Sequence, residues 1–187
     1  MCEYQNNPLG IDTSTPRLGW NFETAARDQY QSAYEIVVRR EGGQAPVWET
    51  GKVITSKNTL IDYKGEALRP FTRYYWKVRT YDAHDQPSGW SGEAWFETAM
   101  LQTSDWQAKW IDNGSALPAR DEDFYQDDPM PLFRKTLNVQ KKLASARLYI
   151  SGLGYYEAYL NERKISDHML DPGWTTYKKE ALYLSNK

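Results

Sequence analysis

The stretch LRPFTRYYWKVRTY, residues Leu68–Tyr81, predicts a half-buried β-strand that is entered through a bend. In its second half the apolar Trp76 and Val78 alternate with basic residues, which is the two-residue period of a strand with one face in a core. A tyrosine that enters such a strand just after Leu-x-Pro fits a tyrosine corner, whose hydroxyl bonds back to the upstream backbone. We therefore predict that Tyr74 forms this corner in a β-sandwich.

Strands of the same kind are predicted on both sides of this stretch. One lies at Gln31–Arg40. Its Tyr34, Ile36 and Val38 share a face and are expected in the core. Shorter strands are predicted at Val47–Val53, Leu60–Tyr63 and Ala94–Thr98. Short strands separated by turn residues are typical of a sandwich, so we assign residues 1–100 to a fibronectin type III or immunoglobulin-like domain, a fold of about 100 residues.

Residues 101–187 are predicted to form a second β-sandwich, jelly-roll-like and incomplete, because the segment is short. Trp106 and Trp110 mark the join and are expected to pin the two domains together. The strands of this second sandwich are predicted at Leu132–Val139, Ala146–Ser151, Tyr155–Leu160, Arg163–His168 and Glu180–Leu184. No segment places apolar residues at the helical spacing over a helix's length, so the fold class is all-β, with two β-sandwich domains in tandem.

One predicted strand of the second domain ends at Leu160 and has two different faces. The more apolar face, formed by Tyr156, Ala158 and Leu160, is expected to point inward. Asn161-Glu162 follows where a two-residue hairpin turn would sit. Such a turn needs positive φ at both central residues, which costs a residue other than glycine about 1–2 kcal/mol. The sequence therefore leaves open a two-residue turn, a longer turn or a turn of another type.

Two stretches, GLGYYEAYLN at 152–161 and SDHMLDPGWTTY at 166–177, resemble the N-terminal region of bacterial α-L-rhamnosidases. These are glycoside hydrolases with a large helical-barrel catalytic domain, and LQTSDWQAKWI at 101–111 is similar to the family's linker. The resemblance implies a parent enzyme that hydrolyses terminal α-L-rhamnosyl residues of plant or bacterial glycans. It also implies that the catalytic acids lie in the barrel, beyond Lys187, so we assign no catalytic residue in this chain.

The resemblance further implies a non-catalytic N-terminal fragment that scaffolds the barrel and binds sugar. Its partners would be a rhamnose-containing carbohydrate and the protein's own C-terminal catalytic domain, and its location periplasmic or extracellular. The alternative is a fibronectin-like module for protein interaction or adhesion, which the fold alone does not separate from the first reading. A helical-repeat barrel after Lys187 would support the enzyme, whereas a membrane anchor or further sandwiches would support the module.

Aromatic side chains next to polar ones suggest a sugar-binding surface in the second domain, and they are equally typical of a sandwich core. The sugar-facing candidates are Tyr155, Tyr159, Asn161, Asp171 and Trp174. For Trp174 we favour a role in capping the sandwich, because burial removes a large apolar area from water. Ser166-Asp167-His168 contains the letters of a catalytic triad, but adjacent residues of a strand point to opposite faces, so we do not expect one.

Composition narrows the class of partner. The chain has 23 basic and 25 acidic residues and a net charge of −2, which argues against nucleic acid. No apolar run approaches the roughly 20 residues that span a bilayer, so we expect no membrane partner. Cys2 is the only cysteine, which excludes an internal disulfide, and no apolar run precedes it to support lipid modification.

Calcium is the one cofactor that the sequence suggests. The acidic loop 121–128 offers the oxygen ligands that calcium prefers, but Gln126 stands where the calcium-binding loop of an EF-hand needs glycine, so a solvated loop is favoured. The family resemblance keeps calcium open, since some relatives bind rhamnose through a calcium ion in the second sandwich. The metal ligands are left unassigned.

Overall fold

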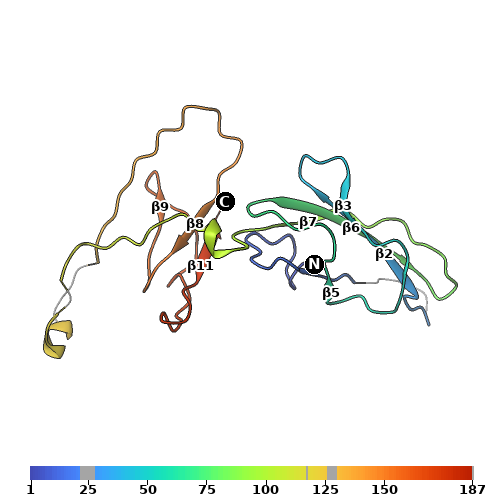
Figure 1. Ribbon diagram of the computed structural model, residues 1–187, viewed down its shortest axis with the longest axis horizontal. Helices are drawn as coiled ribbons and strands as arrows, with labels where there is room; N and C mark the ends of the chain where they lie inside the picture. The colour runs from blue at the N-terminus through green and yellow to red at the C-terminus, as the bar shows by residue number, and fades with distance from the viewer. Residues whose placement is uncertain (22–27, 117, 126–129, 187) are drawn as a thin grey trace.

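The computed structural model describes residues 1–21, 28–116, 118–125 and 130–186. Figure 1 shows two β lobes along the long axis of the molecule, and the chain passes from the first to the second after β7 (Ala94–Glu97). Within the described residues the helices are two short 3-10 turns, η1 (Thr103–Asp105) and η2 (Asp121–Tyr125). The predicted all-β fold class is confirmed. In the same residues we find no helix of the length and hydrophobicity that crossing a membrane requires.

The first lobe packs a five-stranded antiparallel sheet against a two-stranded ladder. The sheet has the order β3-β2-β6-β7, and β4 also pairs with β2. Its other strands are β2 (Ala33–Arg40), β3 (Pro46–Glu49), β4 (Val53–Ile54) and β6 (Arg73–Tyr81). The ladder pairs β1 (Arg17–Leu18) with β5 (Ile61–Asp62). Leu18 of the ladder belongs to the same buried cluster as Ile36 and Val78 of the sheet, so the two layers share one core.

The core face of the sheet follows the predicted two-residue period. Ile36 of β2 lies opposite Val78 of β6, and Val38 lies opposite Trp76. All four side chains are buried, as is Tyr34. The strands predicted at the centre of the sandwich and their inward faces are therefore confirmed.

Tyr74 forms the predicted tyrosine corner. The backbone N–H of Arg69 donates a hydrogen bond to the Tyr74 hydroxyl at 2.8 Å, and the tyrosine is almost completely buried. Its ring stacks on Phe96 of β7 with the ring centroids 5.3 Å apart. The bend before β6 is thereby tied to the strand that follows it.

Replacing Tyr74 by phenylalanine should lower the free energy of unfolding by about 0.5–1.5 kcal/mol, because it removes one buried hydrogen bond and leaves the Arg69 N–H unpaired. Denaturant unfolding measures the change. Tyr75→Phe is the matched control, since that hydroxyl donates to Glu41 in an exposed bond and its loss should change stability by less than about 0.5 kcal/mol. Equal midpoints for the parent and Tyr74→Phe would contradict the corner.

The single strand predicted at Val47–Val53 is wrong in one respect: the structure divides it. β3 pairs with Val37 and Val38 of β2, whereas β4 pairs with the other end of β2. Gly51 lies between them with a φ of +60°, a conformation that interrupts an extended strand. Both β3 and β4 pair with β2, so two short strands, instead of one long strand, form this edge of the sheet.

In its described residues, the second lobe contains two separate two-stranded ladders. β8 (Leu148–Ser151) pairs with β11 (Tyr183–Asn186), and β9 (Tyr159–Leu160) pairs with β10 (Arg163–Lys164). The β9–β10 turn has two residues, because Asn161 and Glu162 both have positive φ, 50° and 68°. The turn is therefore the compact form, with a non-glycine residue at its second position. The predicted strands at Arg163–His168 and Glu180–Leu184 are shortened or shifted accordingly.

Two predictions for this lobe are wrong. The segment Leu132–Val139 forms no strand, and Leu132 is 96% exposed. Leu160, predicted to point inward with Tyr156 and Ala158, is 65% exposed. An alternating pattern makes a buried strand only where neighbours supply backbone partners and an apolar cover. Among the described residues, 132–139 have no ladder partner, and Leu160 is paired with Arg163 of β10 but has no apolar cover.

The tryptophans of the join differ in their surroundings. Trp106 lies 5.9 Å from the ring of Tyr183 in the second lobe, as expected for a residue that pins the join. Trp110 is largely exposed, so the same prediction is wrong for this residue. One tryptophan, rather than two, contributes to the connection.

Candidate functional site

Trp174 lies in a group of three aromatic rings on the second lobe. Its ring centroid is 5.7 Å from that of Tyr155 and 5.6 Å from that of Tyr177. Trp174 is 68% exposed and Tyr155 is also exposed, whereas Tyr177 is half-buried. We call Tyr155, Trp174 and Tyr177 the aromatic surface. It is open to solvent on at least two of its rings.

Hydrogen bonds between two turns hold the aromatic surface together. The backbone N–H of Gly154 donates to the Tyr177 hydroxyl at 2.9 Å. The N–H of Tyr156 donates to the Asp171 carbonyl at 2.8 Å. Gly154 has a φ of +115°, which a residue with a side chain rarely adopts, so glycine is required there for the turn. The turn before Tyr155 is thus tied to the segment that carries the other two rings.

The prediction that Trp174 caps the sandwich is wrong. The indole is mostly in contact with water, and its ring contacts are the two tyrosines of the aromatic surface. The physical reason is the layout of the lobe: in the described residues, two short ladders do not enclose a core deep enough to cover a side chain of this size. An exposed ring supported from both sides is the geometry that a stacking contact needs.

Of the five sugar-facing candidates, the structure brings together Tyr155 and Trp174. The hydroxyl of Tyr159 donates to Glu157 at 2.7 Å instead, and Asn161 occupies the β9–β10 turn. The half-buried side chain of Asp171 points toward Ser166 and His168 rather than toward the rings. A role for these three residues in binding sugar stays a prediction without a shared site.

Ser166, Asp167 and His168 do not form a catalytic triad. Ser166 Oγ lies 3.5 Å from Asp171 Oδ2, and His168 Nδ1 lies 3.5 Å from the same oxygen. Serine and histidine therefore both approach a carboxylate instead of each other, whereas nucleophilic catalysis needs the histidine to take the proton of the serine. Residues 166–168 lie outside β10, so a bend of the chain arranges them, and not the strand period from which we predicted no triad.

Among the described residues we find no group of three or more His, Cys, Asp or Glu that could hold a metal ion. Residues 126–128 of the acidic loop, including Gln126, lie outside the described residues. In the described part of that loop, Asp123 is engaged by Arg120 in a hydrogen-bonded ion pair at 2.9 Å. Calcium stays a prediction that rests on the family resemblance.

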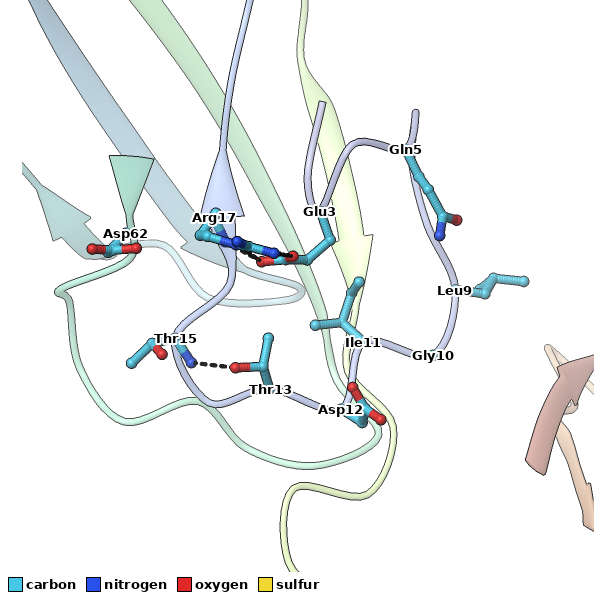
Figure 2. Close-up of a pocket in the computed structure, with 10 residues that line it drawn as sticks. All are labelled: Glu3, Gln5, Leu9, Gly10, Ile11, Asp12, Thr13, Thr15, Arg17 and Asp62. Atoms are coloured by element: carbon cyan, nitrogen blue, oxygen red, sulfur yellow. Dashed lines mark hydrogen bonds and ion pairs between the residues drawn. The ribbon is translucent and has the colours of Figure 1, made fainter. Parts of the chain in front are cut away.

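The first lobe has a polar cleft of about 470 Å³, shown in Figure 2. Arg17 and Glu3 form a hydrogen-bonded ion pair at 2.6 Å across one side of it. The other polar residues that line it are Gln5, Asp12, Thr13, Thr15 and Asp62. Leu9 and Ile11 are its apolar lining residues, and none of the described residues that line it is aromatic. Because small-molecule sites are lined mainly by apolar and aromatic side chains, we favour the aromatic surface as the candidate site.

The fold defines the class: a tandem all-β module that begins with an immunoglobulin-like sandwich. Residues 1–102 match the family model of the Rha78A-like N-terminal immunoglobulin domain, and residues 141–185 match the α-L-rhamnosidase N-terminal domain. The chain therefore belongs to the Rha78A-like N-terminal immunoglobulin domain family.

Proteins named α-L-rhamnosidase match nearly the whole chain. An α-L-rhamnosidase of Formosa agariphila is 34% identical over 99% of this chain and 21% of its own length, and one of Streptomyces avermitilis is 32% identical over 92% and 19%. The solved α-L-rhamnosidase from Dictyoglumus thermophilum matches with a TM-score of 0.84 at 35% identity, over 100% of this chain and 22% of that one. The chain thus spans about a fifth of the length of these relatives.

One solved relative carries a sugar. The structure of the Streptomyces avermitilis α-L-rhamnosidase complexed with L-rhamnose matches 59% of this chain and 11% of that one, at 42% identity and a TM-score of 0.56. The native enzyme from Aspergillus terreus, at 28% identity, matches all of this chain and 21% of its own with a TM-score of 0.78. The fold of the whole chain is therefore similar to that in the enzymes from Dictyoglumus thermophilum and Aspergillus terreus.

Proposed function

We propose that this chain is the N-terminal, non-catalytic part of an α-L-rhamnosidase, which hydrolyses terminal α-L-rhamnosyl residues. The observation that carries the proposal is the order of the two family matches: an immunoglobulin-like domain at 1–102 and an α-L-rhamnosidase N-terminal domain at 141–185. Relatives matched over nearly the whole chain have the same name. The role of this part is to support the catalytic domain and to contact rhamnose-containing glycans.

The aromatic surface is the part proposed to contact sugar. Pyranose rings have apolar C–H faces, and exposed aromatic rings offer the flat apolar partner that such faces pack on. Trp174 has this exposure and is braced by Tyr155 and Tyr177. The hydroxyl of Tyr177 is already used by the Gly154 N–H, so that ring is fixed in place before any ligand arrives.

The proposal includes export of the parent protein to the periplasm or the extracellular space, where plant and bacterial glycans are met. It also allows calcium to take part in rhamnose binding. The alternative of an adhesion module has no support of its own, because the similar proteins are named as α-L-rhamnosidases.

Replacing Trp174 by alanine should weaken the binding of L-rhamnose by about 2- to 10-fold, since one aromatic contact contributes about 0.5–1.5 kcal/mol. Calorimetric titration with L-rhamnose, with and without added calcium, measures the change. A parallel thermal melt shows whether the variant stays folded.

Trp110→Ala is the matched control, because Trp110 is also an exposed tryptophan but lies outside the aromatic surface. It should bind L-rhamnose as the parent does. Equal binding by the parent and Trp174→Ala would remove the sugar role from the aromatic surface and leave the scaffolding role. Calcium-dependent heat in the parent would favour a calcium-assisted site.

A further inference from the structure

Glu97, at the end of β7, is a buried carboxylate held by two arginines from different lobes. It is 7% exposed. Arg73 of β6 donates to Oε2 at 2.9 Å from within the first lobe. Arg147, just before β8 in the second lobe, donates from Nε to Oε1 at 2.5 Å and from Nη2 to Oε2 at 2.8 Å. The Arg147–Glu97 contact is bidentate, a fork of two parallel hydrogen bonds, which is the strongest geometry for an arginine and a carboxylate.

The two arginines stabilise the charged Glu97 carboxylate from different lobes. Burial raises the pKa of Glu97, but the hydrogen bonds from Arg147 and Arg73 outweigh it, so the pKa lies below its usual value and the group stays charged. Arg73 alone would keep the carboxylate paired inside the first lobe. Arg147 adds the bond that crosses to the second lobe, and an arginine so little exposed needs that partner in turn.

Aromatic and backbone contacts surround the ion pairs. Phe71 of the first lobe lies 5.3 Å from Tyr149 of the second, centroid to centroid, and Tyr149 lies 6.2 Å from Tyr183. On another side, a Cβ placed on Gly10 would lie 2.3 Å from the Oγ of Ser185 in β11. The same Cβ would lie 3.1 Å from the Cβ of Ser185, so a side chain at Gly10 would force Ser185 to move.

We propose that Glu97 and Arg147 form a lock that fixes the second lobe on the first, so that the chain is one rigid arm. Two domains joined by a segment without strands would by default move independently. Here the join is crossed by a forked ion pair, a ring contact and the close approach of Gly10 to the side chain of Ser185 (Figure 1 shows β8 and β11 on the side of the second lobe that faces the first). The lock does not depend on the proposed sugar contact.

The distance distribution between two spin labels, measured by pulsed electron resonance, tests the lock in the full 187-residue chain. Labels are attached to the exposed positions Gln44→Cys in the first lobe and Lys178→Cys in the second. Cys2 stays unlabelled, because it is buried and burial raises the pKa of its thiol to about 12. The parent should give one narrow distance peak.

Arg147→Gln removes the bonds between the lobes and leaves the Arg73–Glu97 pair intact, so the distance peak should broaden at least twofold. Arg147→Lys keeps the charge without the fork and should broaden it less. Glu3→Gln is the control, since it breaks the Glu3–Arg17 ion pair within the first lobe and should leave the peak unchanged.

A second pair of variants tests the lock without touching a charge. Gly10→Ala and Gly42→Ala both place a side chain at positive φ, +80° and +71°, so their backbone strain is similar. Only Gly10 faces the other lobe; Gly42 has nothing within 4 Å. Gly10→Ala should broaden the distance peak and Gly42→Ala should not. A broad peak in the parent, or unchanged peaks in both Arg147→Gln and Gly10→Ala, would overturn the lock.

Discussion

Replacing Phe96 by alanine should lower the free energy of unfolding of the first lobe by about 3–5 kcal/mol, the range for an emptied aromatic core site. Phe96 is completely buried and stacks on Tyr74, so its removal leaves a cavity beside the tyrosine corner. In a lobe of this size the loss corresponds to a fall in melting temperature of at least about 12 °C. Differential scanning calorimetry measures both quantities.

Trp174→Ala is the informative comparison. An indole has more apolar surface than a phenyl ring, yet Trp174 is exposed and its removal should change the melt by less than about 0.5 kcal/mol. A large destabilisation by Trp174→Ala would restore the capping role that its exposure contradicts. A small effect of Phe96→Ala would mean that the core of the first lobe is not packed as described.

The purified chain should not release the phenol from an aryl α-L-rhamnoside above the rate of buffer alone. Glycoside hydrolysis needs two carboxyl groups about 5–10 Å apart on either side of the scissile bond. The family matches of this chain cover N-terminal domains, and the chain spans about a fifth of each relative. The sequence likewise assigns no catalytic acid here.

A colorimetric assay at high protein concentration checks this expectation. The control is a chain that carries Glu157→Gln and Asp171→Asn together, both acidic residues near the aromatic surface. If the parent gave turnover that this variant lost, the chain would contain an active site and the non-catalytic assignment would be wrong. Turnover equal in both would point to a contaminating enzyme.

Local patterns were sufficient for the first lobe. The period of two around Ile36 and Trp76 predicted the strands and their inward faces, because each strand does pair within one sheet whose apolar face is covered by the β1–β5 ladder. The bend before Tyr74 gave the corner, because its partner Arg69 is only five residues away. The tyrosine corner depends on neighbours in sequence, whereas the inward faces depend only on the alternation within each strand, which is visible before the strands are paired.

The wrong predictions concern positions whose burial depends on partners far along the chain. Leu132–Val139 and Leu160 have the pattern of strand residues but lack covering neighbours in the described structure. Trp174 has the size of a core residue, and only the layout of the lobe shows that it is exposed.

Long separations along the sequence also hid the roles of three residues, Tyr177, Glu97 and Arg147. Tyr177 joins the aromatic surface through a bond to Gly154, 23 residues earlier, so three-residue spacing from Trp174 was the only available signal. Glu97 and Arg147 are 50 residues apart, and no periodicity connects them. Ion pairs of this kind become visible only once the chain is folded.

The connection between the lobes forms no strand in its described residues, and this has a consequence for handling the molecule. Between η1 and β8, Lys109, Arg134 and Lys141 are exposed, and the described backbone around them takes part in no ladder. Trypsin needs an accessible, extended substrate and finds it there, whereas Arg73 and Arg79 are held in the sheet and in ion pairs. Arg147 is engaged with Glu97, which shields its side chain from the protease. Brief digestion would thus nick the tether and yield the first sandwich as a resistant core, with the β8–β11 piece retained on it by side chains alone.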